Sequence, residues 1–392
     1  MAVRRTPYGW EGWATGTVNG RRVRMHIRGR TRAEVSDAVR AAESALRAGT
    51  GTGLLPGGDR VTVSAWLTSW IAGRTASVRP KTLVGYQLDQ KHIDRTIGAV
   101  QLGRLTPEHV EKLYAEMAER GLSAGTVLHV RRTLSAALTT AVARGRIARN
   151  VVRLAVVPRD EPPEIEPLTL VEAQAIARVA TERRNGARWL VALALGLRQG
   201  EVLGLQWSDV DWEAGTLSVR RGLQRRPWRH GCPETAPCGR RPQDCPLAVG
   251  GGLIAAPTKT RSSRRNLALP APLIAAMTEH CQTQAVERAR AGELWLDGNW
   301  VFATEVGTPI DPRNDLREWV RIVAAAGIRR IRIHDIRHTS ATLQLVAGTD
   351  SRTLQGLFGW SSPVLVARYA HVVEQAKRDA AQRIGDILWS DS

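Results

Sequence analysis

The alternation of apolar and polar positions predicts a small sheet packed on a helix at the start of the chain. Residues 13–18 and 21–27 alternate as strands do, and the Asn-Gly pair at 19–20 between them is a strong hairpin signal. Thr31 and Glu34 have the spacing of a helix-capping box. Apolar residues then recur at helical spacing, at Val35, Val39, Ala42 and Leu46.

The next stretch has the periodicity of helices alone. Residues 51–60 are rich in glycine and have the composition of a flexible linker. Four helices are expected after it, with start signals at Thr62, Pro80, Thr106 and Ser123. The pattern therefore predicts an all-helical domain over residues 61–153, joined by the linker to a first α+β domain of residues 1–50.

A second linker and a mixed domain follow. Prolines and acidic residues alternate within 154–168, which is typical of a domain boundary. Beyond it helical spacing predominates, and the clearest strands are at 216–220 and 266–269. The expected fold class is thus multidomain: a small α+β domain, an all-α domain, and a mixed α+β domain over residues 169–392.

Charge is the strongest compositional signal. The chain carries a net charge of +19 with a pI near 11.1, which indicates a polyanionic partner, with nucleic acid favoured over an anionic membrane surface. A hydrophobic content of 43% is enough for buried cores. No apolar run reaches the ~18 residues of a membrane span, and the N-terminus lacks the apolar segment of a signal peptide. We therefore expect a cytosolic, nucleoid-associated protein, and its excess of arginine over lysine is typical of a GC-rich genome.

Residues near the C-terminus suggest chemistry on phosphate. His334 and Arg337 are three residues apart, on one face of an expected helix. Tyr369 follows further along, with Trp360 shortly before it. Two phosphate-binding side chains and a phenol are typical of phosphoryl transfer through a covalent tyrosine intermediate. A surface helix followed by a core tyrosine would give the same pattern, so these residues alone leave both interpretations open.

Three upstream residues could complete such a site. Arg198 lies between an expected helix that ends at Gly196 and the helix that follows, and Glu201 is placed to hold an arginine or histidine. A capping glutamate beside a surface arginine is the alternative. Lys259 is one of only five lysines among 56 basic residues. Lysine can donate a proton near neutral pH and arginine cannot, so Lys259 is either a general acid or a passive contact to a DNA backbone.

Together these segments resemble the tyrosine recombinases, the lambda-integrase-like family. Four segments match the two arginine boxes and the nucleophile box of that family: 196–201, 334–342, 357–360 and 369–371. The layout of the resemblance extends over residues 60–390. Residues 1–50 resemble the arm-binding domain of phage and integrative-element integrases. The small α+β domain would then be arm-binding, and the all-α domain core-binding.

The resemblance implies a set of catalytic residues: Arg198, Glu201, Lys259, His334, Arg337, Trp360 and Tyr369. Tyr369 would attack the scissile phosphate, giving a 3′-phosphotyrosine and a free 5′-hydroxyl, while the two arginines neutralise the non-bridging oxygens. Lys259 would protonate the leaving oxygen, His334 would assist proton transfer at Tyr369, and Glu201 would support the arrangement. Trp360 stands where most relatives carry histidine. Indole cannot exchange a proton, so it is expected to position phosphate or Tyr369. His338 is expected only to pack or to form a hydrogen bond.

The resemblance also implies partners. Double-stranded DNA would be clamped at core sites by the helical and catalytic domains and held at arm sites by the N-terminal domain, so that a homotetramer inserts or excises a mobile element. An excisionase and a host DNA-bending protein are further partners that the family allows. No cofactor, metal or ATP would be needed, because the phosphotyrosine conserves the phosphodiester energy. Residues 372–388 are expected to form a helix that docks on a neighbouring protomer or on its own domain.

Residues 224–252 are an expected insert in the catalytic domain. His230, Cys232, Cys238 and Cys245 could bind one zinc ion, but their spacing lacks a CxxC knuckle, and a loop of free thiols is the favoured interpretation. Two other functions are compatible with the resemblance: a catalytically idle DNA-binding regulator, and a resolvase-type enzyme with the same chemistry. The complete catalytic set argues against the first, and the arm-type domain argues against the second.

Overall fold

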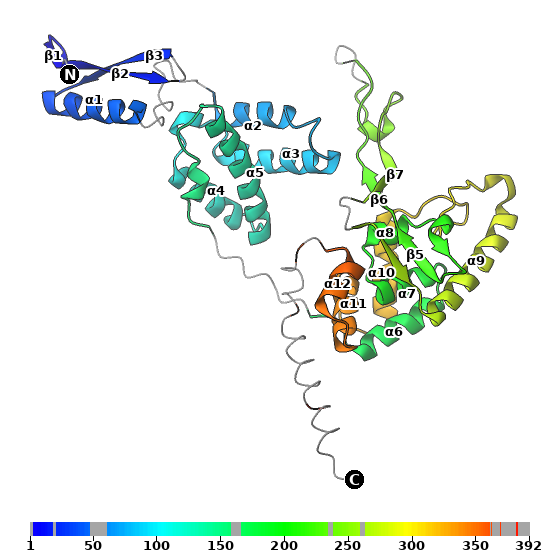
Figure 1. The fold of residues 1–392 in the computed structure, drawn as a ribbon. Helices are drawn as coiled ribbons and strands as arrows, with labels where there is room; N and C mark the ends of the chain where they lie inside the picture. The colour runs from blue at the N-terminus through cyan, green and yellow to red at the C-terminus, as the bar shows by residue number, and fades with distance from the viewer. Residues whose placement is uncertain are drawn as a thin grey trace. The chain divides into compact units, whose positions relative to one another are not determined.

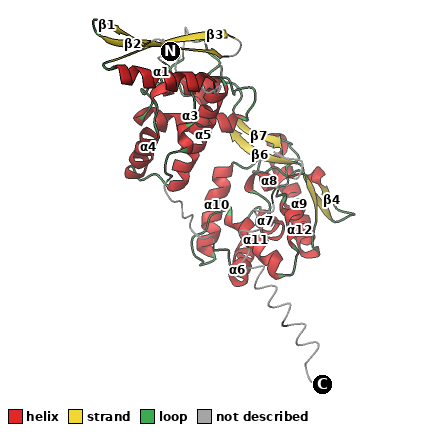
Figure 2. Ribbon diagram, turned by 60° about the vertical axis from the view of Figure 1, so that its left-hand side comes forward, coloured by secondary structure: helices red, strands yellow, loops and turns green. Residues whose placement is uncertain are grey.

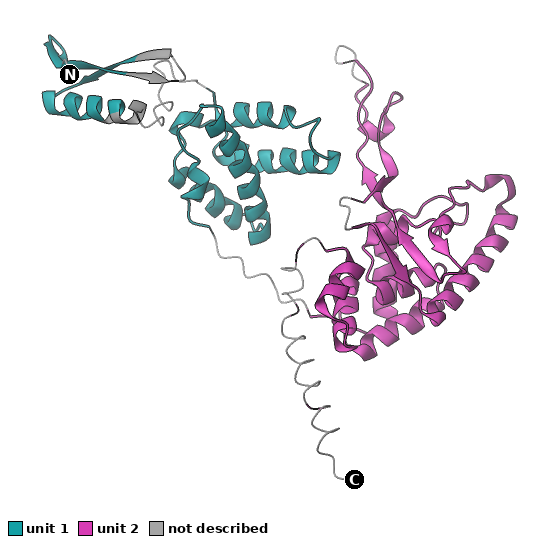
Figure 3. Ribbon diagram, in the orientation of Figure 1, with its two compact units in different colours: residues 1–163 teal, residues 164–392 magenta. Residues whose placement is uncertain are grey.

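The computed structural model of the chain divides into two compact units, residues 1–163 and residues 164–392 (Figure 3). The described residues are 3–18, 21–47, 61–157, 166–233, 238–258 and 263–360, with Ser362, Tyr369 and Gln382. The boundary between the units falls inside the linker expected at 154–168. Several features named from the sequence lie outside the described residues: the Asn-Gly turn at 19–20, the linker 51–60, residues 158–165 of the second linker, Lys259 and, apart from Gln382, the helix 372–388.

The first unit begins with a three-stranded antiparallel sheet, in the order β1-β2-β3, with one helix along its face (Figure 1). The elements are β1 (Val3–Thr6), β2 (Gly9–Val18), β3 (Arg21–Gly29) and α1 (Arg32–Arg47). Val18 pairs with Arg21, as the expected hairpin requires, whereas β1 is a strand that the sequence did not predict. Ala14 of the sheet and Val35 and Val39 of α1 are fully buried and form a small core of their own.

A helical bundle with a separate core completes the first unit. Its elements are α2 (Val63–Ala72), α3 (Pro80–Thr96), η2 (Leu102–Arg104), α4 (Pro107–Glu119), α5 (Ala124–Ala143) and η3 (Val151–Arg153). Thr62 and Ser123 each cap a helix by accepting a hydrogen bond from a backbone amide in its first turn. Trp66 and Trp70 are buried, and their indoles donate hydrogen bonds to α5 at 3.1 and 2.9 Å. The four expected helices are therefore present, and α2 is held against α5 by polar as well as apolar contacts.

The second unit combines helices with two small sheets (Figure 2). Its helices are α6 (Leu170–Thr181), α7 (Ala187–Leu195), α8 (Gln199–Leu203), η4 (Trp207–Asp209), η5 (Pro242–Asp244), α9 (Ala271–Ala291), η7 (Gly292–Leu294), α10 (Pro312–Ala325), α11 (Asp335–Val346) and α12 (Ser351–Phe358). Its strands are β4 (Val210–Asp211), β5 (Thr216–Val219), β6 (Arg221–Arg226), β7 (Gly252–Pro257) and β8 (Arg265–Ala268). Strands β4, β5 and β8 form one antiparallel sheet, and β6 and β7 form a hairpin that projects from the helices (Figure 1).

One large apolar core supports the second unit. Trp189 of α7 and Trp319 of α10 stack with ring centroids 5.1 Å apart, and both are nearly inaccessible to solvent. Leu217 of β5 and Leu267 of β8 enter the same core from the sheet, and Ile336 enters it from α11. Each such side chain contributes roughly 1.5–3 kcal/mol of transfer free energy. Because Ile336 belongs to this core, the start of α11 is fixed to the body of the unit.

The mixed content expected of the last domain is present. The expected strands at 216–220 and 266–269 correspond to β5 and β8, which pair with each other. The helix expected after Arg198 corresponds to α8. Strands β6 and β7 were not identified from the sequence, because each is too short to show a clear period. None of the helices in the described part of the chain combines the length and hydropathy needed to cross a bilayer.

Candidate active site

A sharp turn between two helices presents the first arginine of the site. Helix α7 ends at Leu195, and Gly196 follows in the left-handed conformation with φ of 60°. A Cβ atom at this glycine would lie 2.3 Å from the ring of Phe358, so the position needs glycine for space as well as for its backbone angle. Arg198 then adopts an extended conformation just before α8, and its side chain is 39% exposed. The guanidinium is therefore open to a ligand.

Arg337 is the buried cation of the site. It lies in the first turn of α11, and its guanidinium donates hydrogen bonds to the carbonyl oxygen of Gly196, at 2.6 Å, and to that of Phe358. The ion pairs found among the described residues include none with Arg337. Burial, together with the nearby charge of Arg198, lowers the pKa of Arg337 to about 9, so this arginine stays protonated at neutral pH. Its positive charge is held in place by neutral acceptors and is not cancelled.

Glu201 connects two further arginines. Its buried carboxylate accepts hydrogen bonds from Arg198 at 2.7 Å and from Arg265 at 3.0 Å. Burial alone would raise the pKa of Glu201, but the charges of Arg265 and Arg198 outweigh it and lower this pKa. Arg265 is only 6% exposed and also donates to the carbonyl oxygen of Leu357 at 2.6 Å. The sequence did not single out Arg265, although its position in phase with the buried Leu267 on β8 was an available signal.

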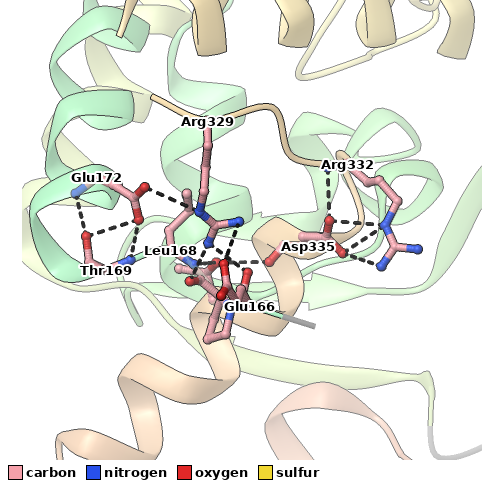
Figure 4. Close-up of polar contacts among 9 residues, drawn as sticks. Glu166, Leu168, Thr169, Glu172, Arg329, Arg332 and Asp335 are labelled. Atoms are coloured by element: carbon pink, nitrogen blue, oxygen red, sulfur yellow. Dashed lines mark hydrogen bonds and ion pairs between the residues drawn. The ribbon is translucent and has the colours of Figure 1, made fainter. Parts of the chain in front are cut away.

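His334 immediately precedes α11, beside Arg337. Burial and the charges of Arg337 and Arg198 lower the pKa of His334, so its imidazole is neutral at neutral pH and can accept a proton. The neighbouring Asp335 is hydrogen-bonded to Arg332. Its carboxylate accepts hydrogen bonds from the guanidinium and the backbone amide of Arg332, both at 2.9 Å (Figure 4).

Tyr369 lies against α11 and Trp360. Its hydroxyl oxygen is 2.5 Å from Nδ1 of His338, which is a hydrogen-bond distance. The rings of Trp360 and Tyr369 stack with centroids 5.7 Å apart and an interplanar angle of 19°. The guanidinium carbon of Arg337 lies 5.7 Å from the centre of the Trp360 ring. The phenol, the indole, one imidazole and one guanidinium are thus gathered in one cluster.

Polar contacts fix the start of α11 to the start of the unit (Figure 4). The hydroxyl of Thr339 accepts a hydrogen bond from the backbone amide of Leu168 at 2.9 Å. Arg329, shortly before α11, donates to the carbonyl oxygen of Glu166 at 2.9 Å and lies 3.5 Å from the carboxylate of Glu172. These contacts therefore join α11, and the segment just before it, to residues about 160 positions earlier in the sequence.

A basic hollow of about 860 Å³ opens where the β6–β7 hairpin meets the β4-β5-β8 sheet. The arginines on its walls are Arg220, Arg221, Arg264 and Arg265. Asp209 offsets part of this charge, since its carboxylate lies 2.5 Å from Arg221 and 3.8 Å from Arg220. Pro257 and Arg264, which line the hollow, are the lining residues that lie nearest to Lys259 in the sequence.

Six of the seven residues expected at the site are described, and they lie together in the second unit: Arg198, Glu201, His334, Arg337, Trp360 and Tyr369. Lys259 lies outside the described residues. His338 was expected to pack or to form a hydrogen bond, but the sequence did not identify Tyr369 as its partner. The spacing of His338, one helical turn after His334, places the two imidazoles 5.3 Å apart, and this was the only available signal.

Known proteins resemble this chain over nearly its full length. The model of the phage integrase family matches residues 168–376. An integrase of Saccharopolyspora erythraea is 38% identical over 97% of this chain and 94% of its own length. A tyrosine recombinase XerC-like protein of Caldanaerobacter subterraneus is 27% identical, over 94% of this chain and 93% of its own length.

Solved structures share the fold. The Tn1549 transposon integrase in complex with a circular intermediate DNA has a TM-score of 0.67 at 19% identity, covering 83% of this chain and 99% of that chain. A lambda integrase tetramer bound to a Holliday junction has a TM-score of 0.55 at 20% identity, covering 92% and 89%. Since the family model matches more than half of the sequence and a relative is 38% identical over 97% of it, the chain belongs to the phage integrase family and is a site-specific DNA recombinase of the tyrosine-recombinase type.

Proposed function

We propose that Tyr369 cleaves and rejoins DNA through a covalent 3′-phosphotyrosine, and that the cluster around α11 is the active site. The observation that carries this proposal is the hydroxyl of Tyr369, which is hydrogen-bonded to His338 on the same helix that holds Arg337. A phenol oxygen attacks phosphorus only if it is oriented and loses its proton as the bond forms. This cluster offers an orienting contact, a neutral imidazole and two guanidinium groups.

Arg198 and Arg337 are proposed to bind the non-bridging oxygens of the scissile phosphate. Together with Arg265 they bring three positive charges to this region, and Glu201 pairs with Arg198 and Arg265 but not with Arg337. Burial and the nearby charge of Arg198 lower the pKa of Arg337, and a bound phosphate would offset both effects by supplying negative charge beside the guanidinium. Charge that builds on the phosphate oxygens during attack would be stabilised for the same reason. Glu201 would keep Arg198 aimed at the phosphate.

Protons would move at two atoms. His334, neutral at neutral pH, would assist removal of the proton from Tyr369 as the oxygen–phosphorus bond forms. Lys259 is proposed to protonate the 5′-oxygen as its bond to phosphorus breaks, on the strength of its residue type. Trp360, stacked on Tyr369, would position the phenol. The phosphodiester energy is retained in the phosphotyrosine, so the reverse attack by a 5′-hydroxyl rejoins the strand without ATP.

Double-stranded DNA is the proposed partner of both units. The Tn1549 transposon integrase is known in complex with circular intermediate DNA, and lambda integrase as a tetramer on a Holliday junction. We infer the same substrate class and a homotetramer for this chain, acting at the attachment sites of a mobile element. The helical bundle would be the core-binding domain and the N-terminal sheet the arm-binding domain. Linking the two modules would raise the effective concentration of one DNA site once the other is bound.

The N-terminal sheet has a suitable surface for phosphate. Gly12 faces α1, so alternation places Trp13, His26 and the arginines at 24 and 28 on the opposite, open face. Trp13 stacks on His26 with ring centroids 5.0 Å apart, and the guanidinium of Arg24 lies 5.1 Å from the Trp13 ring. This face combines flat rings with cations and supports the proposal of DNA contact.

A nicked attachment-site duplex tests the proposed chemistry. The nick lets the short product diffuse away, so the protein should become trapped on DNA as a covalent adduct. Mass spectrometry should place the adduct on Tyr369, and Tyr369→Phe should abolish it without loss of DNA binding. Tyr86→Phe, in the helical bundle, is the matched control and should form the adduct as wild type does. Failure of the wild-type chain to form an adduct, or an adduct that persists in Tyr369→Phe, would refute the proposal.

A further inference from the structure

Four sulfur and nitrogen ligands meet at the tip of the β6–β7 hairpin. The strands end at Arg226 and begin again at Gly252, and a bridge between Arg229 and Val249 continues the pairing outward. Beyond that bridge lie the four residues with metal-ligand side chains: His230, Cys232, Cys238 and Cys245. One ligand atom from each lies within 4.8 Å of the others.

Three of the separations between ligand atoms are close to those expected around tetrahedral zinc. Nδ1 of His230 is 3.7 Å from Sγ of Cys232 and 3.5 Å from Sγ of Cys238, and the sulfurs of Cys232 and Cys245 are 3.9 Å apart. Tetrahedral zinc, with Zn–S of ~2.3 Å and Zn–N of ~2.0 Å, separates two sulfurs by about 3.8 Å and a sulfur from a nitrogen by about 3.5 Å. A disulfide would need sulfurs ~2.05 Å apart, so the Cys232–Cys245 separation excludes that bond here.

Backbone amides donate hydrogen bonds to two of the three sulfurs. Cys238 accepts a hydrogen bond from the backbone amide of Arg240, and Cys245 accepts one from that of Leu247, each two residues further along. Cys245 receives a second one from the amide of Gly231. Amide donors stabilise negative charge on sulfur, and such contacts to first-layer ligands tune and orient metal sites.

The turns that shape the tip need glycine. Gly239 follows Cys238 with φ of 64°, which lets the chain fold the Arg240 amide back onto the sulfur. A Cβ at Gly231 would lie 2.1 Å from the carbonyl oxygen of Leu247, so the segments that carry Cys232 and Cys245 approach too closely for any side chain there. The four ligands are thus brought together by the path of the backbone.

Apolar packing does not explain why this tip is folded. In the described part of the chain, the tip contributes no residue to the large core of the unit. Leu247 and Val249, its larger aliphatic side chains, are 57% and 46% exposed, whereas Cys245 is only 5% exposed. A loop of this length without a core must be stabilised by another kind of bond, and four ligands around one metal supply it.

We propose that His230, Cys232, Cys238 and Cys245 bind one structural Zn²⁺ that holds the tip of the β6–β7 hairpin. Three thiols would release their protons on binding, and the imidazole would bind neutral, so the site would carry one net negative charge. Arg229, Arg240 and Arg241 are close in sequence and would offset it. With all four positions filled by protein, the ion would have no open site for catalysis. The proposal goes beyond the recombination chemistry and does not depend on it.

Zinc content of the full chain tests the proposal directly. The protein is purified without a histidine tag or chelator, under a reductant, and zinc is measured by plasma mass spectrometry. About one equivalent per chain is expected for wild type and for Cys281→Ser, the matched control, because this fourth cysteine lies on α9 outside the cluster. Cys238→Ser should retain much less. Replacement with Co²⁺ should give tetrahedral visible bands and a thiolate-to-metal charge-transfer band.

Two substitutions of His230 distinguish loss of a metal ligand from misfolding of the tip. His230→Cys keeps four ligands and should keep both the zinc and the charge-transfer band, whereas His230→Ala should lose affinity for the metal. Wild-type protein that holds less than about a tenth of an equivalent after reconstitution with Zn²⁺ would overturn the proposal. Equal zinc in Cys238→Ser and Cys281→Ser would overturn it as well. Adduct formation by Tyr369 is a separate readout, so failure of the zinc site would not affect the proposed recombination chemistry.

Discussion

At the scale of single residues, the orientation of Tyr369 depends on two side chains that differ in kind. His338 makes a hydrogen bond to its hydroxyl, and Trp360 lies flat on its ring. A histidine could exchange a proton at the Trp360 position, but an indole cannot. We therefore propose that Trp360 orients the phenol by stacking on it, and that His338 orients it by a hydrogen bond. His338 is a positioning residue in this proposal, because it acts on the phosphate only through the phenol.

Replacing His338 should slow cleavage without weakening DNA binding. His338→Ala removes a hydrogen bond whose net value is about 0.5–1.5 kcal/mol, so single-turnover cleavage of the nicked duplex should fall roughly 3–10-fold. His338→Gln can still bond to the hydroxyl and should recover part of the rate. Binding measured by fluorescence anisotropy should be equal in all three proteins. A purely structural role predicts instead that both variants lose binding and stability together.

The lowered pKa of His334 should make stability depend on pH. Its folded pKa lies below the unfolded value near 6.5, so the unfolded chain binds the proton more readily. The folded state therefore keeps its full stability above the unfolded pKa. It loses stability as the pH falls through the unfolded pKa towards the lower folded pKa. Urea unfolding at pH ~7.5 and ~5.5 should show a larger loss of stability for wild type than for His334→Gln. Equal losses would show that His334 is not held neutral.

At the scale of elements, a buried ion pair joins the helices that carry the site. Arg188 of α7 donates two hydrogen bonds to Asp315 of α10, both at 2.6 Å. Gln199 of α8 bonds to the same carboxylate at 2.8 Å. Each of these elements also contributes to the turn or the core around Arg198. The Arg188–Asp315 ion pair therefore helps to fix the orientation of α8, and with it the position of Arg198 just before this helix.

Removing one partner of this pair should be costly. Asp315→Ala leaves the guanidinium of Arg188, which is 2% exposed, without its carboxylate, and should destabilise the second unit by about 3–5 kcal/mol. The double variant Arg188→Met with Asp315→Leu removes both charges and should recover most of that loss. Chemical denaturation followed by circular dichroism measures both. If the single variant were as stable as the double one, the ion pair would not hold these helices together.

At the scale of the whole molecule, the net charge of +19 is divided between surfaces with different proposed tasks. The open face of the N-terminal sheet and the hollow beside the hairpin are both rich in arginine. Contacts to DNA phosphates release counterions, so their number sets how steeply affinity falls with salt. Charge on the sheet should therefore affect arm-site binding and leave core-site chemistry unchanged.

Arg24→Ala combined with Arg28→Ala tests this division. If both side chains contact phosphate, the slope of log affinity against log salt for arm-site DNA should become shallower by about 2. Adduct formation on a core-only nicked duplex should stay at the wild-type level, which serves as the internal control. The proposal of an arm-binding sheet fails if the arm-site slope is unchanged.

Much of the fold was determined by local patterns in the sequence. Capping residues such as Thr62 and Ser123, and the Asn-Gly turn before Arg21, act on neighbouring backbone groups, so their effect can be predicted without tertiary structure. The order of Arg198, the His334–Arg337 pair and Tyr369 along the chain also identified the family, because each box is a local motif. The net charge indicated nucleic acid before any contact was known.

Only the tertiary structure decided what those residues touch. Arg265 belongs to the site because its side chain reaches from β8 to Glu201 of α8, a contact that no local motif predicts. His338 likewise contacts Tyr369, which lies 31 residues further along the chain. The cysteines lacked a recognised zinc spacing, and it is the path of the β6–β7 hairpin that brings their sulfurs to tetrahedral distances. Local motifs depend on neighbours along the chain, whereas ligand sets and buried ion pairs depend on neighbours in space, which a single sequence does not specify.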